Sequence, residues 1–125
     1  MDGPLDTEGV VEHGIDNEAV AMLWDQAEQA RAEGDTDAAI RAIERALDVD
    51  PDDAVLWSRL AELRLQTGEA RVAENLATRS NSLAAGQRLL RYRNWLIIEA
   101  ARQQQGDEQG ADAARAEIER LRAGR

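Results

Sequence analysis

Hydrophobic residues recur along this 125-residue chain at helical spacing, in segments separated by glycine or proline. The first segment places four apolar residues at positions i, i+3, i+4 and i+7 of one helix face: Val20, Leu23, Trp24 and Ala27. Gly34 interrupts this pattern, which resumes at Ala39 and ends before Pro51, as expected for a helix, a turn and a second helix. Continued along the chain, the pattern predicts helices at residues 17–33, 37–48, 54–67, 70–83, 87–105 and 109–122.

Three kinds of residue repeat with the same two offsets, 34 and then 38 residues. These are the turn glycines, an alanine of each second helix and a bulky residue of each first helix: Gly34, Gly68 and Gly106; Ala39, Ala73 and Ala111; Leu23, Trp57 and Trp95. Agreement of three markers predicts three helix-turn-helix units, the second longer by about one helical turn. Trp57 belongs to the middle unit, and we expect it to be a buried anchor between its neighbours.

Residues 20–123 resemble the tetratricopeptide repeat (TPR) family. The first unit carries the residues typical of that repeat: Leu23, Ala27, Gly34-Asp35, Ala39, Ala46 and Pro51. The resemblance implies an all-α fold, a right-handed α-solenoid of three TPR-like repeats with six helices, within residues 17–125. Residues 1–16 contain five acids and three Gly, and we predict that they form a disordered acidic tail.

The third unit departs from the family pattern. Glu99 stands where a small residue is usual. The second unit ends at Arg79-Ser80-Asn81-Ser82 without a terminating Pro. The sequence therefore does not specify how the fourth and fifth helices cross. The stretch from Arg79 to Asp107 is also similar to uncharacterised TPR lipoproteins of Gram-negative bacteria. That similarity implies a periplasmic protein if a native N-terminus has been removed; otherwise we expect a cytoplasmic one.

TPR proteins bind peptides on a concave groove lined by the first helix of each pair. Carried over to this chain, the resemblance implies a peptide-binding groove at Trp24, Glu28, Arg31, Arg59, Glu62, Gln66, Arg93, Leu96 and Gln103. Each of these residues also fits an ordinary exposed helix position. The family's clamp for a C-terminal carboxylate uses Lys and Asn, whereas this chain has no Lys. We therefore expect a segment carrying charges of both signs, with Trp24 or Leu96 as its apolar contact.

The residue inventory argues against an enzyme, and we predict no metal site and no cofactor. Cys is absent, which excludes thiolate chemistry and Cys-containing metal sites. The only His, His13, lies in the predicted tail, and acid pairs such as Asp52-Asp53 fit a helix N-cap better than acid–base work. No phosphate-binding loop is present.

Charge and hydropathy exclude some classes of binding partner. The net charge is −10, and residues 1–53 carry sixteen acids against three Arg, which repels nucleic acid. No apolar run approaches the length that spans a bilayer, so we expect no membrane insertion. The chain has fifteen Arg and no Lys, which a GC-rich bacterial genome would explain, and a salt-adapted genome would also explain the excess of acids. We predict a non-enzymatic scaffold or adaptor that binds a protein or peptide. The alternative is a structural or self-associating module of a larger assembly, for example a homodimer, with no free peptide ligand.

Overall fold

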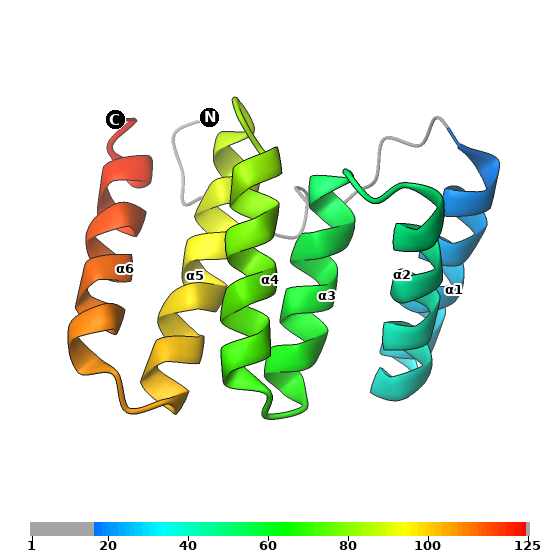
Figure 1. The fold of residues 1–125 in the computed structure, drawn as a ribbon, viewed down its shortest axis with the longest axis horizontal. Coiled ribbons are helices and arrows are strands. Elements are labelled where there is room, and N and C mark those ends of the chain that lie inside the picture. Colours follow the sequence, from blue (N-terminus) through cyan, green and yellow to red (C-terminus); the bar gives the residue numbers. More distant parts are fainter. Residues whose placement is uncertain (1–16, 125) are drawn as a thin grey trace.

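Helices follow one another as three antiparallel pairs in the computed structural model, which describes residues 17–124 (Figure 1). They are α1 (Glu18–Ala32), α2 (Thr36–Val49), α3 (Ala54–Gln66), α4 (Ala70–Leu83), α5 (Arg88–Gln104) and α6 (Glu108–Arg122). Every predicted boundary lies within one residue of the observed one. The predicted disordered tail, residues 1–16, lies outside the described residues.

The helix-turn-helix unit is built locally around a glycine. Gly34 has a φ of 79°, a left-handed backbone conformation in which a side chain would be strained, and Gly68 and Gly106 occupy the same place in the later pairs. Asp35 follows Gly34 and caps α2, because its Oδ1 accepts a hydrogen bond from the Ala38 N–H at 3.1 Å. The repeated Gly-Asp and Gly-Glu steps in the sequence therefore predict the turns correctly.

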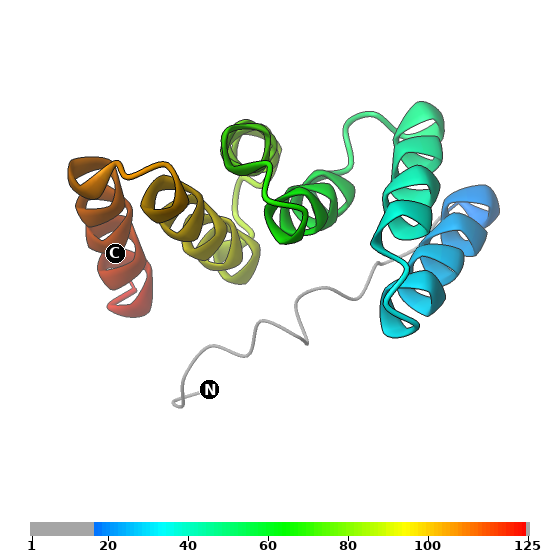
Figure 2. The ribbon, with the colours of Figure 1, turned by 90° about the horizontal axis from the view of Figure 1, so that it is seen from below.

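Small buried side chains hold the pairs together. Four alanines of α2, α3 and α4 have no exposed surface: Ala39, Ala46, Ala61 and Ala73. One hydrophobic cluster joins α1 and α2 to Leu56, Leu60 and Leu63 of α3, and a second joins α3 to α4, α5 and α6. The pairs form a curved row with α1, α3 and α5 toward one side and α2 and α4 toward the other (Figure 2). This confirms the predicted solenoid of six helices.

The crossing of α4 and α5, which the sequence left unspecified, is polar. Ser80 is fully buried, and its Oγ donates to the carbonyl of Ala54 at 2.7 Å and accepts from Asn94 Nδ2 at 2.8 Å. Asn94 Nδ2 also donates to Asn81 Oδ1 at 2.9 Å. Gly86, with a φ of 80°, turns the chain between the two helices. A buried hydrogen-bond network and a glycine thus replace the proline that ends the first unit.

Trp57 differs from the expectation of a buried anchor. It is only partly buried beside the first cluster, and its indole N–H donates to the carbonyl of Pro51 at 2.7 Å. Leu56 and Leu63, on the inner side of the same helix, are the fully buried residues instead. An indole at the edge of the core keeps its N–H paired while its ring covers apolar surface.

Candidate protein-binding face

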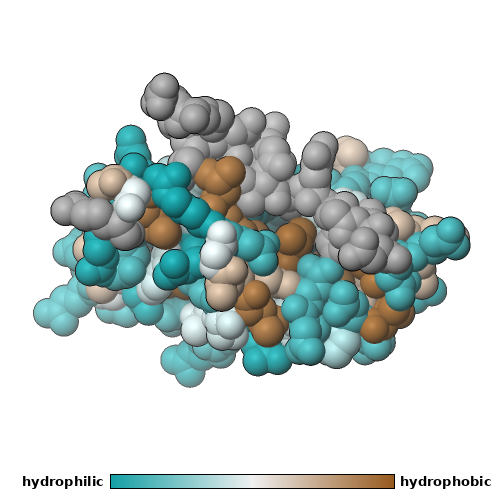
Figure 3. Space-filling view, turned by 90° about the horizontal axis from the view of Figure 1, so that it is seen from above, coloured by the Kyte–Doolittle hydropathy of each residue, from teal (hydrophilic) through white to brown (hydrophobic). Residues whose placement is uncertain are grey.

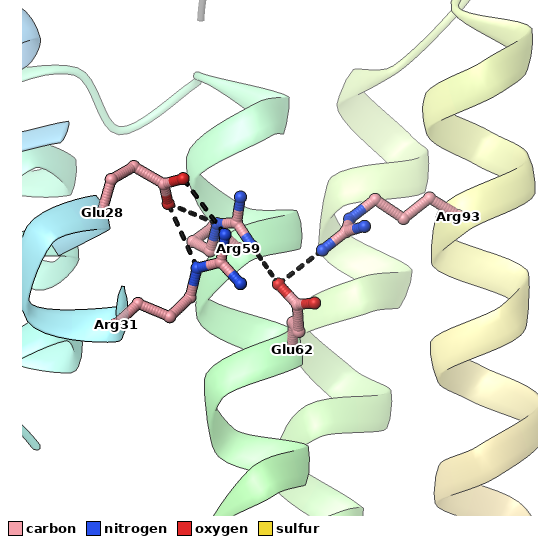
Figure 4. Close-up of polar contacts among 5 residues, drawn as sticks. All are labelled: Glu28, Arg31, Arg59, Glu62 and Arg93. Carbon is pink, nitrogen blue, oxygen red and sulfur yellow. Dashed lines mark hydrogen bonds and ion pairs between the residues drawn. The ribbon is translucent and has the colours of Figure 1, made fainter. Parts of the chain in front are cut away.

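Charged side chains from α1, α3 and α5, the first helices of the three pairs, meet on one face of the solenoid (Figure 4). We call these five residues the ion-pair network: Glu28, Arg31, Arg59, Glu62 and Arg93. All five belong to the groove that the TPR resemblance implies. The structure therefore brings together five of the nine predicted residues from three separate units of the repeat.

The network runs without a break from α1 to α5. On α1, Arg31 Nη2 lies 3.2 Å from Glu28 Oε2, and Glu28 Oε1 lies 3.2 Å from Arg59 Nε across the junction to α3. Within α3, Arg59 pairs with Glu62. Glu62 Oε1 also lies 2.5 Å from Arg93 Nη2 across the junction to α5. One carboxylate oxygen of Glu62 thus contacts two guanidinium groups.

Burial makes this network unlike a surface salt bridge. Only 3% of Arg59 and 8% of Arg93 is exposed, so each guanidinium has lost most of its hydration and depends on its carboxylate partners. Burial lowers the pKa of Arg59, although Glu62 and Glu28 act in the opposite direction. Burial by itself would raise the pKa of Glu62, but Arg93 and Arg59 outweigh it and hold this pKa below its ordinary value. Glu62 is therefore a stable carboxylate at neutral pH.

Trp24 lies beneath the network and is not an open contact for a ligand. Its side chain is 6% exposed and belongs to the first hydrophobic cluster, and the Arg59 guanidinium carbon lies 5.2 Å from the centroid of its ring. That distance allows a cation–π interaction, which helps a buried Arg to remain charged. The prediction of Trp24 as an apolar anchor for a peptide needs correction, because Arg59 and neighbouring helices cover the ring.

A pocket of about 300 Å³ opens between α3 and α5 at the end of the network. One turn of each helix lines it: Glu62, Leu65 and Gln66 from α3, and Arg93, Leu96 and Ile97 from α5. On both helices these are positions i, i+3 and i+4, which share one side. Leu65 and Leu96 are partly exposed and Gln66 is exposed, so the pocket offers apolar surface beside fixed charges.

The remaining predicted residue, Gln103, stands apart from this pocket. It is exposed in the last turn of α5. Sequence reasoning missed Leu65 and Ile97, which line the pocket. Their spacing from Glu62 and Arg93 by three and four residues was available as a signal, because such neighbours lie on the same side of a helix.

Within residues 17–124, no group of three or more His, Cys, Asp or Glu side chains is arranged to hold a metal ion. No helix in that range is long and apolar enough to cross a membrane.

Comparison with known proteins places this geometry among helical repeats. The family model described as tetratricopeptide repeat matches residues 30–90. A solved structure, the globular C-terminal domain of P. aeruginosa LpoP, is 35% identical in sequence and has a TM-score of 0.78. The match covers 82% of this chain and 97% of that chain. No curated protein sequence matches.

Proposed function

Because the chain belongs to the tetratricopeptide repeat family, we propose that it is a protein–protein interaction module that binds a peptide or protein segment on the face formed by α1, α3 and α5. The observation that carries this proposal is the pocket between α3 and α5, in which Leu65 and Leu96 lie beside Glu62 and Arg93. Apolar surface next to a few well-placed polar groups is the usual composition of a binding site.

Preorganisation of the face supports the proposal. The charged groups next to the pocket are held by ion pairs within the protein, so little conformational entropy is lost when a ligand contacts them. Both signs of charge are present, which suits a segment that also carries both signs. The protein's own helices set the geometry before any partner arrives.

The chemistry of the same face supports a binding role over a catalytic one. Neither His nor Cys occurs between residues 17 and 124. Glu62 is paired with two Arg, and the lowered pKa makes it a weak base. A general base works best with a pKa near the working pH, and Glu62 has been moved the other way.

A peptide-display selection on the purified protein tests the proposal. Enriched peptides are synthesised, and their affinity for the wild type is compared by calorimetry with that for Leu96→Asp. Val72→Asp on α4 is the matched control, because it places the same charge at an exposed apolar residue away from the face. We expect Leu96→Asp to weaken binding by about tenfold or more and Val72→Asp to leave it unchanged. Equal losses from the two variants would refute binding on this face.

Self-association is the alternative, and sedimentation at several concentrations separates it from peptide binding. Viewed from above, hydrophobic residues form small separate patches among hydrophilic ones (Figure 3). Within the described part of the chain, the exposed large apolar residues are also dispersed, with Met22 on α1, Val49 at the end of α2 and Val72 on α4. Stable obligate dimers usually bury a larger continuous apolar surface, so this dispersion favours a monomer that binds other proteins. A dimer disrupted by Leu96→Asp would instead support the structural alternative.

A further inference from the structure

The ion-pair network contains three Arg but only two Glu. Arg31, Arg59 and Arg93 face Glu28 and Glu62, which leaves the five residues with a net charge of +1 in a protein whose total charge is −10. Glu28 serves the two Arg at one end, whereas Glu62 divides one oxygen between Arg59 and Arg93. Arg93, at the α3–α5 end where the pocket opens, thus has only a share of one carboxylate oxygen.

Arg93 has unused hydrogen-bonding capacity at this place. Its only ion-pair partner among the described residues is Glu62, through Nη2. Its Nε is buried without a hydrogen-bond partner among residues 17–124. The Arg93 guanidinium has five N–H donors but contacts a single carboxylate, although the residue is only 8% exposed. Buried Arg side chains are normally bonded more completely.

The residues around Arg93 indicate which chemical group of a ligand could pair with its remaining N–H donors. Leu65, Leu96 and Ile97 provide apolar walls, and the Gln66 side-chain amide on α3 can donate or accept a hydrogen bond. A small anion with no apolar part would leave these apolar walls in contact with water. A long apolar side chain would leave the Arg93 donors unpaired in a more deeply buried position. A carboxylate next to an aliphatic side chain satisfies both parts of the pocket.

We propose that Arg93 is a specificity-determining residue that accepts an Asp or Glu side chain of the bound protein segment, with a neighbouring aliphatic residue of that segment seated on Leu65 and Leu96. The inference deepens the proposed function and rests on it. The incoming carboxylate brings the formal charge of these five residues to zero and accepts hydrogen bonds from Arg93 donors that Glu62 does not use, while Glu62 keeps its contact with Nη2. Acidic segments otherwise repelled by this acidic protein are then selected by one buried Arg.

Nuclear magnetic resonance with two tripeptides tests this site. The probes are acetyl-Leu-Glu-Leu-amide and acetyl-Leu-Gln-Leu-amide, which differ only in the carboxylate because both chain ends are blocked. They are titrated to tens of millimolar while the Nε–Hε signal of Arg93 and the methyl signals of Leu65 and Leu96 are followed. We expect the Glu peptide to shift all three residues and to bind about tenfold more tightly than the Gln peptide.

Two variants keep the test independent of folding. Arg93→Lys retains a positive charge for Glu62 but lacks the planar donor pair, so it should reduce the preference for Glu to about twofold. Arg115→Lys is the control, since this Arg lies on α6 and pairs with Glu99 and Asp112 away from the pocket. It should retain the full preference. Melting curves confirm that both variants are folded.

The outcomes separate this inference from the proposed function. Equal shifts by the Glu and Gln peptides at Leu65 and Leu96 would overturn the carboxylate site while supporting segment binding on this face. No shift with either peptide would also overturn the carboxylate site, and the display selection would then decide the proposed function on its own. A preference for Glu that survives Arg93→Lys unchanged would assign the carboxylate to another residue and contradict the role given to Arg93.

Discussion

Replacing Glu62 by Gln is the sharpest test of how this solenoid is held together. Among residues 17–124, Glu62 is the single carboxylate that contacts both Arg59 and Arg93, so the change leaves two buried guanidinium groups short of a partner. Removing one partner of a buried ion pair costs about 3–5 kcal/mol. Gln retains one acceptor oxygen, and Glu62 is 24% exposed, so water reaches part of the site. We expect a loss of about 2–3 kcal/mol in the free energy of unfolding.

Urea unfolding followed by circular dichroism measures this loss directly. The matched control is Glu119→Gln on α6, because Glu119 is 66% exposed and lies 3.7 Å from its i+3 partner Arg122. An exposed pair of this kind contributes less than about 1 kcal/mol. If Glu62→Gln costs no more than Glu119→Gln, the network is ordinary surface charge and the argument from burial is wrong.

The dependence of stability on pH gives a second signature of Glu62. Its pKa is lowered in the folded state, so the unfolded chain binds the proton more readily. The stabilisation is therefore fully present above the ordinary Glu pKa of about 4.3 and is lost as the pH falls through the folded pKa. Acid should destabilise the wild type more steeply in that range than Glu62→Gln, which has no carboxyl group to protonate. Parallel pH profiles would contradict the direction assigned to this pKa.

Two further substitutions test the core, again by urea unfolding. Trp24→Ala removes a buried ring and its contact with Arg59, and should cost about 3–5 kcal/mol; a loss below about 1 kcal/mol would mean that Trp24 is not buried as described. Ser80→Ala takes the hydroxyl that links Ala54 to Asn94 and should cost about 1–3 kcal/mol, whereas Thr78→Ala, an exposed neighbour on α4, should be nearly silent. Equal costs at Ser80 and Thr78 would remove the buried network as the account of the α4–α5 crossing.

The fold was predictable because its determinants are local and repeated. Gly34 and its equivalents fix the turns, and the alanines fix the crossings, so each unit carries the same information in its own sequence. Asp53, predicted to be an N-cap, accepts a hydrogen bond from the Val55 N–H at 2.9 Å. Agreement of helix boundaries to within one residue follows from such end signals rather than from overall propensity.

The candidate site was only partly predictable because burial is decided between units. The sequence pattern correctly places Arg59 on the first helix of its pair. The pattern cannot show that the Trp24 ring lies below Arg59 or that Glu28 lies beside it. These contacts join residues 31 or more positions apart. The same reason explains Glu99: an acid stands at a position where the family has a small residue, and Arg115 of α6 pairs with it at 2.9 Å.

Stability and binding share residues on this face, which decides how substitutions there should be interpreted. Arg59 and Arg93 connect neighbouring pairs of the solenoid, and in such a fold each unit is stabilised mainly by its neighbours. Removing either Arg would loosen a junction and weaken binding even if no ligand touched it. Leu96 and Gln66 line the same pocket without belonging to the network, so their substitution reports on ligand contact alone. A binding defect at Leu96 with unchanged unfolding energy is therefore stronger evidence for this face than any loss caused by removing a buried Arg.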